Sequence, residues 1–440
     1  MLKSMTRVLV LSGVVTLTTA MGSIEGTAGD LLAAEPGKAP TKLTVQANSG
    51  FAVDLYQQLS KEEGNVGKNL LFSPYSISSA LAMTMEGARG QTMKEMGEVL
   101  HFPAQAQRTG GDAQRLPWET SLIHTGFAQL NERFNRKDKP YQLSVANALW
   151  GKIGYPWDPA YVDKLNKSYK TGGIFPMDFA GDPDGSRRYI NKWVEDRTEE
   201  RIKELIPPPE IDSGTALVLT NAIYFKGNWA RPFDKRRTRI LDFTREDRST
   251  VKVPIMSREF SLRVGSAQLG RDNYVTLFEL PYVGEDLSMV LINGRPNLYG
   301  RSNLSLKTIE KYLTAENLDK WLRTLRKEDG VAVRLPRFKM ELEYKLNPTL
   351  KAMGMPTAFR AADFNGLTTS PNDLSISAVL HKGFIEVNEE GTEAAGATAV
   401  MLKESVRPKF DGSRPFIYLI RDNKSGSILF MGRVMDPTEN

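Results

Sequence analysis

The chain has 440 residues, of which 40% are hydrophobic and 25% are charged, a composition ordinary for globular proteins. It contains no cysteine and only three histidines, His101, His124 and His381, so thiol nucleophiles, disulfides and thiolate metal sites are excluded. The formal net charge of +6 is small for this length, and no lysine or arginine block stands out. We therefore expect no metal, no other cofactor and no nucleic-acid partner.

The first 34 residues are typical of a secretion signal and its processing region. Lys3 and Arg7 form a positive segment, and the apolar run from Val8 to Ala20 is shorter than the about 20 residues that span a bilayer. Small residues follow at several positions, so the cleavage position stays open. A membrane anchor is the alternative interpretation. We expect an exported protein, extracellular or periplasmic, with no membrane contact once the signal is removed.

The remaining chain predicts one large domain with helices mostly first and strands mostly later. Residues 35–44, with two prolines and no periodicity, predict a linker, and residues 45–437 the folded domain. Helical spacing of apolar residues predicts helices at 51–59, 76–85, 93–100 and 187–205, the last ended by three prolines. Runs of β-branched and aromatic residues predict strands at 216–224, 251–255, 274–282, 288–292, 331–335, 375–387, 416–420 and 427–434. This order indicates an α+β fold.

The most informative stretch lies between two of these strands, from Glu389 to Lys403. A flexible linker and an alanine-rich helical turn are alternative interpretations. If the stretch is extended, its side chains alternate between two faces. The face without charge consists of Thr392, Ala394, Gly396, Thr398, Val400 and Leu402. Such a segment can enter the middle of a sheet without burying a charge, and a dozen residues would span about 40 Å.

This stretch resembles the hinge of inhibitory serpins, in which small residues stand at these positions. The hinge residues are Glu389, Glu390, Gly391, Thr392, Glu393, Ala394, Ala395, Gly396, Ala397 and Thr398, with Gly396 at the variable position. Segments similar to other serpin motifs follow one another in family order at 69–79, 85–92, 190–194, 219–229, 253–256, 335–338, 416–420 and 430–434. The resemblance extends from about Leu43 to Pro437. It implies the serpin fold, with a large central β-sheet, two further sheets, helices packed around them and an exposed reactive-centre loop.

The resemblance also implies roles for particular residues. It assigns Ser73, Ser76, Asn221 and His381 to the shutter, a polar cluster beneath the two strands that must separate. It assigns Trp229 to the breach, where the loop enters the sheet. Counting from the hinge glycine places the reactive bond between Ser405 and Val406, and the bonds Glu404–Ser405 and Lys403–Glu404 are alternatives.

The function implied is that of a metastable suicide inhibitor. A serine or cysteine protease would attack the loop, form a covalent acyl complex and be trapped as the cleaved loop inserts as an extra strand. The chain would be a monomer, would not be an enzyme and would have no catalytic residues. A serpin acting as a carrier or chaperone is one alternative. A penicillin-recognising hydrolase is another, because Ser249 and Lys252 match the spacing of its serine motif.

Overall fold

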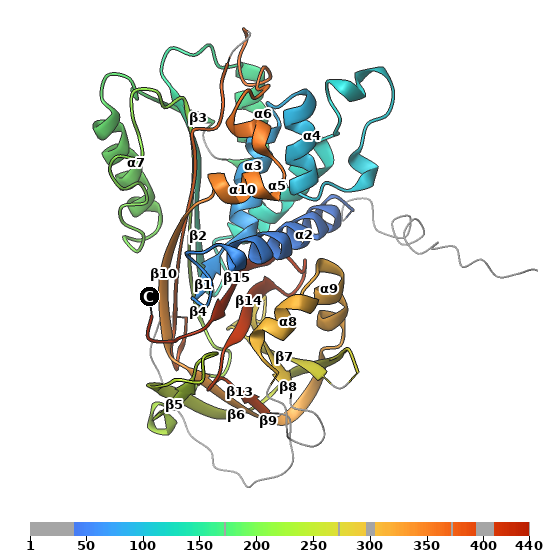
Figure 1. Ribbon diagram of the computed structural model, residues 1–440, viewed down its shortest axis with the longest axis vertical. Coiled ribbons are helices and arrows are strands. Elements are labelled where there is room, and N and C mark those ends of the chain that lie inside the picture. The colour runs from blue at the N-terminus through green and yellow to red at the C-terminus, as the bar shows by residue number, and fades with distance from the viewer. Residues whose placement is uncertain are drawn as a thin grey trace, which may run out of the picture. The chain divides into compact units, whose positions relative to one another are not determined.

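The computed structural model describes residues 39–170, 173–271, 273–295, 304–370, 373–392 and 409–439 (Figure 1). Residues 40–440 form one compact unit. The expected secretion signal at residues 1–34, the second half of the hinge from Glu393 to Thr398, and the candidate cleavage residues Lys403 to Val406 lie outside the described residues. Within the described residues, no helix is both long and apolar enough to cross a bilayer.

The helices lie mainly in the first half of the chain, as the sequence predicts. They are α2 Ala39–Lys61, α3 Pro74–Met85, α4 Gly90–Val99, α5 Ser121–Phe134, α6 Pro159–Tyr169, α7 Pro183–Arg197, α8 Leu306–Tyr312, α9 Ala315–Arg323 and α10 Asn347–Met353. Short 3-10 helices occur at Ala104–Ala106, Gly111–Gln114, Lys235–Arg237 and Pro356–Phe359. The helices predicted at 51–59, 76–85 and 93–100 are confirmed within α2, α3 and α4.

Two predictions near helix ends were wrong. Residues 39–44 are not a linker but the first turns of α2. Proline is tolerated at Pro40 because N–H groups in the first turn of a helix have no partner within the helix, so the N–H that proline lacks is not needed. Leu43 and Thr44 are buried there. The helix predicted at 187–205 ends at Arg197 rather than at the three prolines, since Glu199 and Glu200 have positive φ angles and leave the helical region.

The strands lie mainly in the second half of the chain. They are β1 Leu70–Phe72, β2 Tyr141–Lys152, β3 Ile174–Met177, β4 Leu217–Asn228, β5 Arg239–Thr244, β6 Thr250–Leu269, β7 Asn273–Pro281, β8 Leu287–Arg295, β9 Arg326–Pro336, β10 Phe338–Lys345, β11 Ala378–Val387, β12 Gly391–Thr392, β13 Lys409–Asp411, β14 Phe416–Asp422 and β15 Ile428–Val434. All the predicted strands are present. Six further strands were not predicted: β2, β3 and β10 in the six-stranded sheet, and β1, β5 and β13 in the nine-stranded sheet.

The described strands form two sheets. The six-stranded sheet has the order β10-β11-β4-β2-β3, with the short β12 paired to β4. The nine-stranded sheet has the order β1-β15-β14-β8-β7-β6-β9-β13, with β5 paired to β6. The resemblance implies two further sheets. In the structure their strands form this one hydrogen-bonded sheet, because the long strand β6 belongs to both parts. Its first half pairs with β5 and its second half with β7, on either side of an irregularity at Phe260–Leu262.

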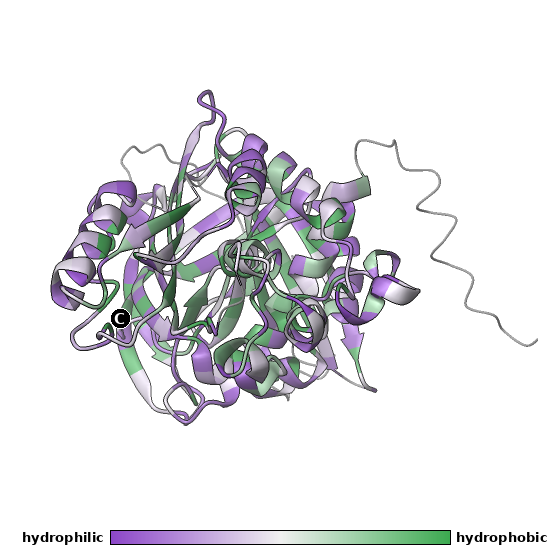
Figure 2. Ribbon diagram, turned by 90° about the horizontal axis from the view of Figure 1, so that it is seen from above, coloured by the Kyte–Doolittle hydropathy of each residue, from purple (hydrophilic) through white to green (hydrophobic). Residues whose placement is uncertain are grey.

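Helices cover both faces of the six-stranded sheet (Figure 1). On one face α7 packs on β2, and a cluster of buried side chains that includes Trp150, Ile190 and Val194 fills the space between them. On the other face α3 packs on β2 and β4. Seen from above, hydrophobic residues gather on the strands and hydrophilic ones on the outer helix turns (Figure 2). Burial on both faces explains why β2 shows no clean alternation of polar and apolar residues.

The centre of this sheet is a parallel strand pair. β11 and β4 pair from Ala378 opposite Val218 to Phe384 opposite Tyr224. On their outer sides both strands have antiparallel neighbours, β10 on β11 and β2 on β4. A strand placed between β11 and β4 would be able to run antiparallel to both. We call this β11–β4 junction the seam.

Candidate functional site

A buried polar cluster lies beneath the middle of the seam, at the pair His381 and Asn221. The backbone N–H of Ser73 donates to Nε2 of His381 at 3.1 Å, so Nε2 is an acceptor and the ring proton is on Nδ1. Nδ1 in turn donates to Oδ1 of Asn221, across the seam. The amide of Asn221 donates to Oγ of Ser76 at 2.6 Å. All four residues assigned to the shutter therefore lie together, and their role in strand separation remains a prediction.

The cluster has a fifth member that the sequence analysis missed, Asn147 on β2. Its Oδ1 accepts from Ser76 Oγ at 2.7 Å and from Asn221 Nδ2 at 2.5 Å, and its own amide donates to the carbonyl of Ser76 at 3.0 Å. Asn147 is the one polar residue in the otherwise apolar run Val145–Trp150, and this was the signal in the sequence that could have identified it. Asn147 completes the hydrogen bonding of the cluster, which matters because unpaired polar groups at this depth are costly.

His381 is fully buried, and burial lowers its pKa to about 3. The imidazole is therefore neutral at physiological pH, as the hydrogen-bond pattern also requires. The ring of Tyr344 on β10 stacks against it, with ring planes 11° apart. A neutral histidine whose hydrogen bonds go to a backbone N–H and to an amide oxygen suits a structural role rather than proton transfer.

The seam is closed at the C-terminal end of β4 by Trp229, which directly follows this strand. We call this the hinge end of the seam. Its indole N–H donates to the carbonyl of Asn388 at 3.0 Å, and its backbone N–H donates to the carbonyl of Glu390 at 2.8 Å. The ring stacks on Tyr282, with centroids 4.7 Å apart and planes at 11°. The residue that the resemblance assigned to the breach therefore connects the end of β4 with the start of the hinge.

The first hinge residues are held by charge pairs. Glu389 is 1% exposed and forms a two-pronged ion pair with Arg337, whose Nε lies 2.9 and 2.8 Å from the carboxylate oxygens. It also accepts a hydrogen bond from the hydroxyl of Thr238. Burial alone would raise the pKa of Glu389, but these two partners lower it below its ordinary value. Glu390 pairs with Lys235 at 2.5 Å.

The next two hinge residues already belong to the sheet. Gly391 and Thr392 form β12, which pairs antiparallel with Asn228 and Gly227 at the end of β4. A Cβ atom on Gly391 would stand 2.2 Å from the carbonyl oxygen of Gly227, so only glycine allows this approach. Thr392 is 1% exposed, and its hydroxyl shares a 3.1 Å hydrogen bond with the hydroxyl of Tyr282. The face that the sequence predicts to be free of charge therefore points into the protein at its first residue.

The penicillin-recognising alternative finds no support in the geometry. Ser249 lies immediately before β6, where its hydroxyl donates to Oδ1 of Asp247 at 2.6 Å. Lys252 lies on that strand and pairs with Asp242 at 2.9 Å. The serine therefore has a carboxylate rather than the lysine as its partner, and the pair does not lie on a helix.

The fold and the site together define a protein built around a seam and a hinge that enters it, the architecture expected of serpins. The family model for serpins, described as serine protease inhibitors, matches residues 46–437. Human Serpin B3 is 40% identical over 400 residues, which cover 89% of this chain and 99% of that protein. Human leukocyte elastase inhibitor is 38% identical over 402 residues, covering 89% and 98%. Human thyroxine-binding globulin superposes with a TM-score of 0.76 at 30% identity, covering 91% of this chain and all of that one.

The chain belongs to the serpin family. On enzymatic activity, the sequence analysis stated only that the chain is not an enzyme. The comparisons correct this negative description, because the family description and the name of leukocyte elastase inhibitor relate the chain to protease inhibitors. The family also includes thyroxine-binding globulin, whose crystal structure contains thyroxine. Membership therefore fixes the fold, and whether this chain inhibits proteases is a separate question.

The neutral state of His381 predicts a loss of stability in acid. The imidazole stays neutral in the folded chain down to a pKa of about 3 but takes up a proton near 6.5 when unfolded, so stability is present above 6.5 and falls as pH decreases. Between pH 6.5 and 5, this residue should lower the free energy of unfolding by about 2 kcal/mol. Urea unfolding of the wild type and His381→Gln at both pH values measures the difference. The variant should show a smaller decrease between the two pH values than the wild type; equal decreases in the two proteins would contradict the assignment.

The ion pair at the hinge predicts a coupled effect of two substitutions. Arg337→Gln leaves the carboxylate of Glu389 buried without its cation and should lower the free energy of unfolding by about 2 kcal/mol, a value reduced because Arg337 is partly exposed. In a Glu389→Gln background the same change should cost much less. Lys320→Gln, which removes an exposed ion pair, is the control and should have no measurable effect. Equal losses in both backgrounds would show that the pair does not stabilise the hinge.

Proposed function

We propose that this chain is a secreted, irreversible inhibitor of serine or cysteine proteases that acts by inserting its cleaved loop into the seam. The observation that supports this most directly is β12. Two residues of the hinge, Gly391 and Thr392, are paired with the end of β4 on the side where β11 has already ended at Val387. The segment that would insert is therefore aligned with the seam before any cleavage.

The register of β12 defines what insertion would bury. Gly391 lies opposite Asn228 and Thr392 opposite Gly227, so each further residue would pair one position earlier on β4. Continued in this register, Leu402 would meet Leu217, the first residue of β4. The segment from Gly391 to Leu402 thus matches β4 in length. The proposed bond Ser405–Val406 would stand just beyond the N-terminal end of β4.

Insertion is favourable in this geometry because it adds hydrogen bonds without burying charge. The N–H and C=O groups of β4 and β11 now pair with each other across the seam. With a new strand between them, each would pair with that strand instead, and the strand would contribute its own backbone groups. The side chains entering on the inner side would be Thr392, Ala394, Gly396, Thr398, Val400 and Leu402, which are small or apolar.

The trapping step follows from protease chemistry. The nucleophile of the protease attacks the carbonyl of the reactive bond, an acyl bond forms to the N-terminal part of the loop, and the new amino terminus leaves. Insertion then moves the acyl-linked protease along the seam. Because deacylation needs reacting groups placed within about 1 Å, distortion of the protease active site stops it. The inhibitor is consumed in a covalent complex and needs no catalytic residue of its own.

A carrier function is the alternative, and similarity to the complex of thyroxine-binding globulin with thyroxine keeps it open. The composition of the hinge favours inhibition over this alternative. A carrier has no need for a stretch of small, uncharged side chains on one face, whereas an inserting strand does. Thr392, which is already buried against Tyr282, lies on that face.

The inhibitory proposal predicts a covalent band on a denaturing gel when the chain meets a matching serine or cysteine protease. A panel of trypsin-, elastase-, subtilisin- and glutamate-specific proteases should give at least one such complex. Mass spectrometry of the cleaved loop would then identify which of the three candidate bonds is cut. Clean cleavage by every protease, without a complex, would favour the carrier.

A matched pair of variants tests insertion itself. Thr398→Arg places a guanidinium on the inner face and should convert the inhibitor into a substrate, with complex yield falling about tenfold or more. Thr398→Val has a similar size and no charge and should leave most of the complex intact. Equal yields from the two variants would argue against insertion in this register.

The secretion proposal depends on the first 34 residues. In a host with a secretory pathway the full chain should appear outside the cytoplasm with a new N-terminus between Met21 and Glu35. A chain that lacks residues 1–34 should remain inside the cell and fold, because the compact unit begins only at Pro40. N-terminal mass spectrometry of both products measures this. Recovery of the intact Met1 terminus from the cytoplasm would contradict export.

A further inference from the structure

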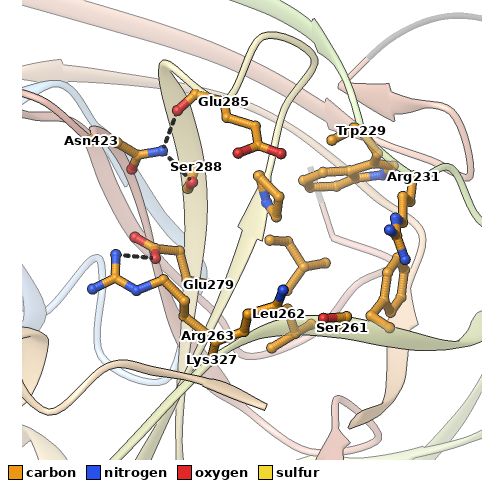
Figure 3. Close-up of a pocket in the computed structure, with 14 residues that line it drawn as sticks. Trp229, Arg231, Ser261, Leu262, Arg263, Glu279, Glu285, Ser288, Lys327 and Asn423 are labelled. Atoms are coloured by element: carbon orange, nitrogen blue, oxygen red, sulfur yellow. Dashed lines mark hydrogen bonds and ion pairs between the residues drawn. The ribbon is translucent and has the colours of Figure 1, made fainter. Parts of the chain in front are cut away.

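A cavity of about 480 Å³ opens beside the breach, between the end of β4, the middle of β6 and the β7–β8 turn (Figure 3). This size falls in the range of sites for small organic molecules, about 300 to 1,000 Å³. Trp229 borders the cavity as well as the hinge. The cavity differs from the seam in that none of the described hinge residues, 389–392, lines it.

One wall of the cavity is apolar and largely aromatic. Trp229 and Phe260 contribute ring surfaces, and Leu262, Leu280 and Pro281 complete the wall. Most of these side chains are almost fully buried, so packing against their neighbours fixes their positions. A flat apolar molecule would find preformed contact surface here.

The opposite wall is polar, and its groups are mostly paired with each other. Glu279 is 4% exposed and pairs with Arg263 at 2.9 Å, as Figure 3 shows. The amide of Asn423 donates to Ser288 Oγ at 2.7 Å and to the carbonyl of Glu285 at 2.8 Å. Among the described residues, Oε1 of Glu279 and Oδ1 of Asn423 accept no hydrogen bond. Two buried acceptors beside a cavity favour an occupant with an N–H or O–H donor.

Positive charge is present at both ends of the cavity. Arg231 lies at the aromatic end, and Lys327 lies beside Arg263 at the polar end (Figure 3). In the described parts of the chain, neither Arg231 nor Lys327 pairs with a carboxylate. Arg258 lies over the ring of Phe260, with its guanidinium carbon 5.5 Å from the ring centroid. Burial lowers the pKa of Arg258, and the neighbouring charges of Arg231 and Arg237 lower it further. Cations crowded in this way attract an anion, whose charge would relieve their mutual repulsion.

We propose that this cavity binds an aromatic organic anion, a flat apolar body with one carboxylate or sulfonate and one hydrogen-bond donor. The body would lie against Trp229, Phe260 and Leu280, and the anionic group would face Arg231. The donor would face Glu279 and Asn423. The proposal concerns a binding site and holds whether or not the chain inhibits a protease.

Two probes with the same aromatic body test the proposal. 8-Anilino-1-naphthalenesulfonate carries a sulfonate and an N–H, and N-phenyl-1-naphthylamine lacks only the sulfonate. Isothermal titration calorimetry on the folded full chain should show one site and affinity about tenfold higher for the sulfonate. Arg231→Gln should remove this difference and leave the affinity for the neutral probe unchanged.

A second variant and a control locate the site. Ser261→Trp places an indole in the cavity and should abolish binding of both probes. Arg326→Gln removes a neighbouring arginine that binds the carbonyls of Arg323 and Leu325 instead of lining the cavity, and it should change nothing. Near-UV circular dichroism must match the wild type in each case, because loosened folds also bind the sulfonate. Equal affinity for the two probes, or binding that survives both Arg231→Gln and Ser261→Trp, would overturn the proposal.

Discussion

The direct pairing of β11 with β4 is the interaction on which the rest of this structure depends. It holds the centre of the six-stranded sheet together, and it occupies the place that an inserted strand would take. Both strands have antiparallel neighbours on their outer sides, so the seam is the position where a further antiparallel strand would gain partners on both edges. A conformational trap of this kind requires a sheet whose strands are fully paired and which can still accept another strand.

Two sets of contacts hold the seam, and they differ in chemistry. In the middle, the hydrogen bond from His381 to Asn221 joins the strands through neutral, fully buried groups with no exposed charge. At the hinge end, an ion pair between Glu389 and Arg337 and the stacked rings of Trp229 and Tyr282 hold the hinge. The cluster in the middle is fully buried, whereas the hinge end lies next to charged surface and to the cavity lined by Arg231. Under the proposed mechanism, strand separation would therefore begin more easily at the hinge end than in the middle.

The hinge shows how local chemistry fits this architecture. Gly391 is the residue at which the chain turns close against Gly227, and no side chain would fit there. Thr392 follows with its side chain directed into the protein. On an inserted strand, this orientation would set the inner face for every second residue beyond it. Gly391 and Thr392 therefore determine which of the two alternating faces would point into the protein on an inserted strand.

The sequence by itself determined the mixed α+β class, most strands of the second half, and the hinge with its uncharged face, because these depend on local composition and on alternation along the chain. It did not determine α2 before Phe51, the end of α7 at Arg197, the helices α5, α6 and α8 to α10, or the strands β1, β2, β3, β5, β10 and β13. Those depend on partners far away in the chain: β2 is buried on both faces and loses its alternation, and only tertiary contacts bury the first turns of α2. The same reason applies to Asn147 and Arg337. Their neighbours in the sequence give no sign of these hydrogen bonds. The bond from Asn221 to Asn147 exists only once β4 lies beside β2, and the bond from Arg337 to Glu389 only once the β9–β10 connection lies beside the hinge.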